Sequence, residues 1–190
     1  MPVTGNAIDY HGEIDKLFDS INAAVRAGSA VTYVLPAQIA KTADLRNLTA
    51  SDEEAINKFK SDRKSASTNS VSVSKEKVEK VFRSGVGDTQ AGHDQVDDIF
   101  NQQDTEYQQQ SDEARKQSHE TLDRLSPGAQ DGFLKLLKAW GPTFVGLFVS
   151  LFGVIKDAVK WLAEAIEKAV NWIVDRAKEL WGTITGWFGG

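Results

Sequence analysis

The stretch AWGPTFVGLFVSLFGVI, from Ala139 to Ile155, constrains the fold more than any other because it contains no charged residue. In a helix these 17 residues rise about 25 Å, short of the roughly 30 Å hydrocarbon core of a bilayer. A start at Phe133 gives 23 residues, provided that Lys135 and Lys138 extend toward the headgroups. The stretch is therefore predicted either to cross a membrane or to be the buried helix of a soluble bundle.

Two features within this stretch favour contact with lipid or with another helix. Phe144, Phe148 and Phe152 recur every four residues and form an aromatic ridge on a helix. Small residues gather near one face beside that ridge, a spacing that permits close helix contact in lipid. These predicted helix-contact residues are Gly146, Ser150 and Gly153.

Beyond Ile155 the sequence predicts an amphipathic helix that extends to about Phe188. Its apolar residues follow a near-heptad spacing, with charged residues on the opposite face. Residues 132–190 contain all five tryptophans of the chain, together with seven basic and five acidic residues. Indole rings combined with lysines are typical of the membrane interface. The residues predicted to enter a membrane are Phe133, Leu137, Trp140, Phe144, Phe148, Phe152, Trp161, Trp172, Trp181 and Trp187.

Helical spacing also dominates the rest of the chain. The predicted fold class is therefore all-α, an elongated helical bundle with a hydrophobic and amphipathic C-terminal segment. One apolar stripe begins at Ile14 and stops before Gly28. A capping box formed by Ser51 and Glu54 starts another helix. The serine-rich run at residues 65–74 is predicted to be a flexible loop.

The region before the C-terminal segment is predicted to hold two further helices. A short one is capped by Ser74 and closed by Gly85, and a long acidic one covers residues 88–125. The apolar stripe of the acidic helix is thin, so this helix needs neighbours. It could lie against the apolar face of the C-terminal segment as an inhibitory cover, although a solvated bundle face is the more common explanation of a charge run.

These patterns divide the chain into two predicted parts. Residues 1–126 form a polar, acidic helical body, and residues 127–190 form a tryptophan-rich tail. Within the tail, the Gly-Pro pair at residues 141–142 is predicted to break the helix, because proline lacks the backbone N–H. The tail is expected to swing about glycine-containing or proline-containing hinges. The predicted hinge residues are Gly85, Gly87, Pro127, Gly128, Gly141 and Pro142.

Several kinds of chemistry find no support in the sequence. There is no cysteine, which excludes disulfides and thiolate metal sites. His11, His93 and His119 are isolated, and no metalloprotease, nucleotide-binding or nucleophile-elbow motif occurs. No catalytic residue, metal site, cofactor or small-molecule substrate is therefore expected, and the protein is not expected to be an enzyme. The lack of a strongly basic face argues against nucleic acid as a partner.

The sequence best fits a membrane-active protein that forms pores or permeabilises bilayers, with lipid as its partner and a homo-oligomer on the membrane. In general design it is similar to α-helical pore-forming toxins, which unfold a hydrophobic hairpin from a helical bundle. Two alternatives stay open: a structural or viral assembly protein whose C-terminal seam is an oligomer interface, and a protein that binds lipid surfaces peripherally. The first residues lack a secretory signal pattern, so we expect synthesis in the cytosol, followed by membrane association or non-classical release.

Overall fold

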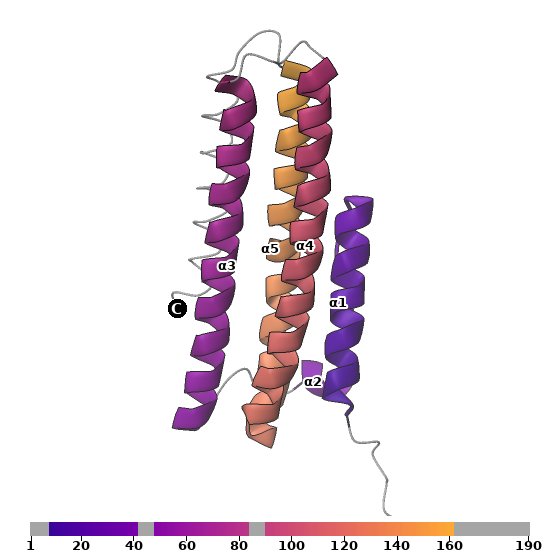
Figure 1. Ribbon diagram of the computed structural model, residues 1–190. Helices are drawn as coiled ribbons and strands as arrows, with labels where there is room; N and C mark the ends of the chain where they lie inside the picture. The colour runs from indigo at the N-terminus through magenta and orange to yellow at the C-terminus, as the bar shows by residue number, and fades with distance from the viewer. Residues whose placement is uncertain (1–7, 42–47, 84–89, 162–190) are drawn as a thin grey trace, which may run out of the picture.

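The computed structural model describes residues 8–41, 48–83 and 90–161, and every regular element in these ranges is a helix. The helices are α1 (Tyr10–Ala27), α2 (Ala37–Ala40), α3 (Ala50–Arg83), α4 (Gln90–Arg124) and α5 (Pro127–Trp161). Figure 1 shows α3, α4 and α5 as long neighbouring helices, with the shorter α1 beside α4 and α5. The predicted all-α, elongated bundle is confirmed.

Helix α1 ends where the sequence predicts. At its start, the Asp9 carboxylate accepts a hydrogen bond from the Gly12 N–H at 3.0 Å and so caps the first turn. At its end, Gly28 adopts the left-handed conformation with a φ of 59°, which glycine reaches without a steric cost. The chain then folds back along α1, where the Thr32 N–H donates to the Ser20 hydroxyl at 2.9 Å.

The core lies where α1, α3 and α4 meet α5. The large side chains that are essentially inaccessible to solvent are Ile14, Leu17, Phe18, Ile21, Ile39, Tyr107, Leu122, Phe133, Leu134, Leu137, Leu147 and Phe148. More of these come from α5 than from any other described helix. Helix α5 is therefore the apolar centre about which the other helices pack.

The serine-rich run at residues 65–74 is helical, so the predicted flexible loop is wrong. It lies within α3, a helix of 34 residues that packs against α4 and also includes the separate helix predicted to start at Ser74. Ser67 and Ser70 are buried in this contact, and the Gln110 amide of α4 donates to the Ser70 hydroxyl. Small side chains let two helices approach closely, and this packing overrides the weak helix propensity of serine.

The Gly-Pro pair at residues 141–142 does not break α5, so this prediction is also wrong. The helix runs through both residues over a length of 35 residues. Pro142 lies on the exposed side, where water can reach a carbonyl oxygen that lacks its helical donor. Gly141 faces α1: a Cβ built at this position would lie only 3.1 Å from Cδ1 of Ile21. The missing side chain therefore allows α1 to approach α5 closely.

Candidate membrane-active segment

Five of the ten residues predicted to enter a membrane form a buried face of α5. Phe133, Leu137, Trp140, Phe144 and Phe148 are each at most 4% exposed. Their spacing of three or four residues places them along one side of the helix. In this bundle the apolar segment is therefore covered by the other helices.

Aromatic contacts join the covering helices to α5. The centroid of the Trp140 ring lies 6.3 Å from that of Phe18 on α1 and 6.4 Å from that of Phe59 on α3. Within α5, Phe144 follows one turn later at a centroid distance of 4.6 Å. Tilted and edge-to-face pairs of this kind stabilise a fold beyond the apolar area that they bury. Trp140 thus connects three helices at one point.

Helix α4 covers the next part of the same face through Tyr107. The Tyr107 ring lies 4.9 Å from Phe148 and 6.0 Å from Phe144, measured between centroids. Its hydroxyl donates to the Asn22 side chain of α1, and burial raises the pKa of Tyr107 to about 12. Of the two alternatives that the sequence leaves for the acidic helix, these distances show contact with the apolar segment.

The covering helices α1 and α4 hold each other through polar side chains. Two rows of residues, each with members four positions apart, face one another across this contact. They are His11, Asp15 and Asp19 on α1, and Arg115, His119 and Asp123 on α4. These rows were not predicted from the sequence, although their equal spacing and opposite charges are visible in it and fit two adjacent helices.

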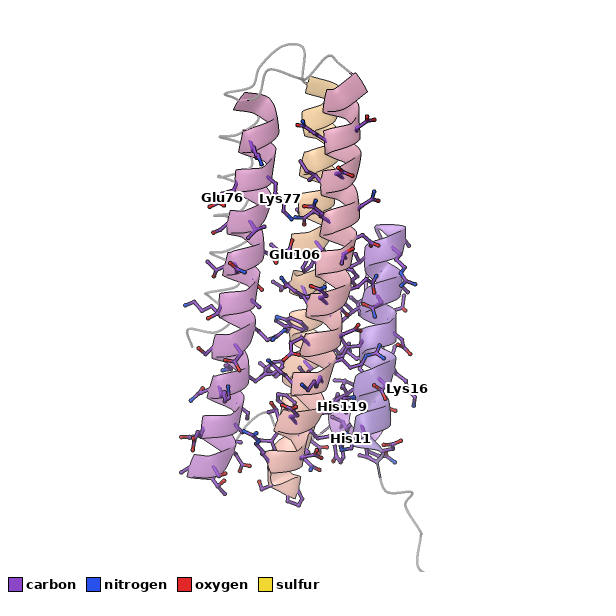
Figure 2. The ribbon with its side chains drawn as sticks, viewed as in Figure 1. His11, Lys16, Glu76, Lys77, Glu106 and His119 are labelled. Atoms are coloured by element: carbon purple, nitrogen blue, oxygen red, sulfur yellow. The ribbon has the colours of Figure 1, made fainter. Side chains whose placement is uncertain are left out.

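His11 and His119 are not isolated, which corrects the interpretation from the sequence. Their Nδ1 atoms lie 2.7 Å apart, although 107 residues separate them in the chain. The Nε2 atom of His11 lies 3.0 Å from Asp123, and that of His119 lies 3.0 Å from Asp15. Figure 2 shows both rings between α1 and α4. The two histidines and two carboxylates therefore form one continuous network.

The contact between α3 and α4 is also polar over much of its length. The buried Arg63 donates to the Gln117 side chain at 2.7 Å. Farther along, Lys77 and Glu106 form an ion pair at 3.7 Å (Figure 2). Burying a charged group costs free energy unless hydrogen bonds compensate, so these contacts contribute little net stability. Polar side chains thus make up an important part of the contact between α3 and α4.

Asp52 fixes the junction at which the sequence predicts a hinge, residues 127–128. Its carboxylate accepts hydrogen bonds from the Ser126 N–H at 2.7 Å and from the Ser126 hydroxyl at 2.9 Å. It also accepts from the Thr49 N–H at 2.9 Å, and Asp52 N–H donates to the Thr49 hydroxyl at 3.2 Å. Thr49 and Asp52 therefore form the capping pair of α3, and the predicted capping box two residues later is wrong.

The electrostatics of Asp52 follow from these contacts. The side chain is 1% exposed, and the backbone N–H groups of Ser126 and Thr49 lower its pKa to about 2. Hydrogen bonds of this kind favour the ionised carboxylate. The junction between α4 and α5 is consequently held by a charged group that stays ionised at every physiological pH.

We expect Asp52→Asn to lower the Tm by roughly 2–4 °C at neutral pH, because the amide cannot accept all of these hydrogen bonds. The pKa is depressed in the folded state, so the stabilisation is present above pH 4 and is lost as the pH falls toward 2. The difference in Tm between the two proteins should therefore persist from pH 7 to about pH 5 and close near pH 2. Thermal melts followed by circular dichroism measure it, and a difference that does not change with pH would contradict this account.

The predicted helix-contact face of α5 lies on a side of the helix that the other described helices leave partly exposed. Gly146 and Ser150 are partly exposed, and a Cβ built on Gly146 would meet no atom within 4 Å. The bundle therefore does not use these residues for close packing. Phe152, Gly153 and Trp161 belong to α5, but the structure describes only their backbone. The other predicted residues lie outside the described ranges: Gly85, Gly87, Trp172, Trp181 and Trp187.

Within the described residues, α5 is the one helix long and apolar enough to cross a membrane. The qualifying segment is Pro127–Ser150, 24 residues, with 56% of its most apolar window buried in the bundle. The core helix of a soluble protein passes the same test. Length and composition alone therefore leave both predicted roles of the segment open.

Among residues 8–41, 48–83 and 90–161, no group of three or more His, Cys, Asp or Glu side chains could hold a metal ion. No family model, curated protein or solved structure matches the chain.

Proposed function

We propose that this protein is membrane-active and that α5, with the amphipathic segment after it, enters a lipid bilayer once it separates from α1, α3 and α4. Several copies would then form a pore or permeabilise the membrane. One observation supports this proposal above the others. The most apolar helix is central, whereas the helices around it bind one another largely through polar side chains.

The free energies of the two kinds of contact favour such an exchange. Apolar side chains of α5 that leave the bundle regain a similar apolar environment in hydrocarbon, worth about 25 cal/mol per Å² removed from water. Hydrogen bonds between the covering helices contribute only about 0.5–1.5 kcal/mol each, because water replaces them when they open. The bilayer can therefore offset most of the free energy lost when α5 leaves its covers.

The charges of α5 also suit insertion. Lys138 and Lys156 bracket the uncharged stretch of residues 139–155, one at each end. Lysine side chains at such positions extend to the headgroups while their stems stay in apolar surroundings. Residues 139–155 are shorter than the hydrocarbon core is thick, and a bilayer accommodates such a segment by becoming thinner around it.

The sharpest test places a charge in the middle of this stretch without disturbing the bundle. At Gly146 there is open space, and aspartate has a higher helix propensity than glycine, so Gly146→Asp should fold with an unchanged or higher Tm. A charge at the bilayer centre costs about 2.5–3.5 kcal/mol. We expect dye release from phosphatidylcholine–phosphatidylglycerol vesicles to fall by at least about tenfold relative to the native chain.

Gly146→Ala is the matched control, because it fills the same space without a charge. It should release dye as the native chain does. Equal release by Gly146→Asp and Gly146→Ala would show that this stretch does not enter lipid. No release by the native chain at micromolar concentration, together with a discrete oligomer in lipid-free buffer, would replace the proposal with the assembly-protein alternative.

A further inference from the structure

A hydrogen-bonded network of four side chains fastens the start of α1 to the last turns of α4. It runs from Asp123 through His11 and His119 to Asp15, with contacts of 3.0, 2.7 and 3.0 Å. The planes of the two imidazoles differ by 13°, and their centroids are 5.0 Å apart. The 2.7 Å between the two Nδ1 atoms accounts for more than half of the 5.0 Å between the centroids, so the nitrogens lie between the two rings. The rings therefore meet edge to edge, as an N–H···N hydrogen bond requires.

The charge of this network follows from the number of hydrogens on the ring nitrogens that its three contacts need. An ionised carboxylate only accepts, so both Nε2 atoms must carry a hydrogen to bind Asp15 and Asp123. The contact between the Nδ1 atoms needs a third hydrogen. Two neutral imidazoles hold two ring hydrogens, whereas one neutral ring and one imidazolium hold three. The geometry therefore corresponds to a pair that carries one positive charge.

Helix dipoles favour that charge on His119. His11 lies in the first turn of α1, where the positive end of the dipole opposes a cation. His119 lies toward the C-terminal end of α4, where the dipole has the opposite sign. In this arrangement His119 donates through Nδ1, and His11 accepts through Nδ1 and donates through Nε2 to Asp123. A second proton would have to bind His11 Nδ1, directly opposite the hydrogen on His119.

The charged groups around the pair come from the three helices that meet here. They are Asp15 and Asp19 on α1, Arg115 and Asp123 on α4, and Asp131 on α5, with the pairs Lys16–Glu13 and Lys116–Glu120 on neighbouring turns. Asp131 accepts from the Tyr10 hydroxyl at 2.6 Å, and Arg115 lies 3.9 Å from Asp15. None of these groups lies between the two Nδ1 atoms, because the two nitrogens are in direct contact. None of them can therefore shield one ring from the charge of the other.

We propose that this network is an acid-released latch on α1. A second proton sets two N–H donors and two positive charges against each other, so the contact between His11 and His119 breaks and α1 loosens from α4. The inference rests on the proposed function and describes its regulation. Helix α1 covers α5 at Gly141 and Trp140, so a loosened α1 uncovers the first part of the apolar segment.

The latch opens in a pH range in which other contacts hold. Histidine changes charge between about pH 8 and 5, whereas aspartate and glutamate stay largely ionised down to about pH 5. The junction at Ser126 also stays closed there, because the pKa of Asp52 is about 2. Acid therefore acts at the edge of α1 before it acts at the start of α5.

Spin labels can measure the latch in the full-length protein. The chain has no cysteine, so labels on Lys16→Cys and Lys116→Cys report the distance between α1 and α4 alone. Both lysine side chains are about two-thirds exposed, so labelling leaves the core intact. Between about pH 7.5 and 5.5, without lipid, we expect the distances to lengthen and the α1 amides to exchange about tenfold faster.

Two histidine variants make the test specific. His119→Gln keeps a hydrogen-bonding side chain that cannot become charged, so it should abolish the response to acid. His93→Gln removes the third histidine of the chain and should leave the response intact. Unchanged distances at pH 5.5 in the otherwise native chain, or an equal response in His119→Gln, would overturn the latch.

Dye release over the same pH range separates the latch from the proposed function. Equal release at both pH values, with unchanged distances, would reject the latch and leave membrane activity standing. Longer distances at pH 5.5 without dye release at any pH would support the latch and reject membrane activity. Release that rises together with the distance supports both.

Discussion

A disulfide between α1 and α5, made by Ile21→Cys with Gly141→Cys, should abolish dye release until a reductant is added. A Cβ at residue 141 would lie 3.1 and 3.3 Å from two side-chain atoms of Ile21. Ile21→Cys removes the atom at 3.1 Å and makes room for a sulfur atom, so the pair can approach the separation of about 3.5–4.5 Å between Cβ atoms that a disulfide needs. The cross-link ties α5 to α1 and prevents the exchange of the bundle for lipid.

The single variants Ile21→Cys and Gly141→Cys are the matched controls. Neither can form an intramolecular disulfide, because the native chain has no cysteine. Each should release dye equally with and without reductant. Undiminished release by the double variant, with complete oxidation verified by mass spectrometry, would show that α5 acts on membranes without leaving α1.

Sequence patterns correctly predicted the helices whose signal, an apolar stripe or a run of acidic residues, lies within the helix itself. The apolar stripe that starts at Ile14 gave α1 together with its end at Gly28. The acidic run at residues 88–125 corresponds closely to α4, Gln90–Arg124. Periodicity is decisive in such cases, because one face of the helix carries most of the buried area.

The two wrong predictions of a break in helical structure share one physical cause. Serine at residues 65–74 and the Gly-Pro pair at residues 141–142 are unfavourable in isolated helices. In the bundle, small serines fit against α4 and Gly141 admits Ile21, so tertiary packing outweighs local preference. The sequence shows that the serines and Gly141 are small. It does not show that a neighbouring helix packs so closely that only a small residue fits.

The same distinction applies to the candidate site: one part was predicted from the sequence and the other was not. The sequence alone singled out the apolar face of α5, because all of its residues lie within one helix. The network of His11 and His119 joins helices more than 100 residues apart, so it depends on which faces of α1 and α4 meet. The equal spacing of the two polar rows was visible, but their register across the contact was set only by the packing of both helices on α5.

Trp140→Ala should lower the free energy of unfolding by about 3–5 kcal/mol and the Tm by roughly 10 °C. The side chain is 4% exposed and contacts aromatic rings on α1, α3 and α5, so its loss leaves a cavity at the point where three helices meet. Urea denaturation and thermal melts of the full-length protein measure the effect.

Val34→Ala is the control for this change, because Val34 is 78% exposed and its substitution should alter stability by less than about 0.5 kcal/mol. A loss below about 1 kcal/mol for Trp140→Ala would mean that the bundle does not depend on this contact.

Dye release by the same variant then identifies the role of the indole. If Trp140 chiefly holds the covering helices on α5, its removal should raise release at neutral pH, in the direction opposite to the disulfide. A fall in release despite a weakened bundle would place the indole among the groups that bind lipid.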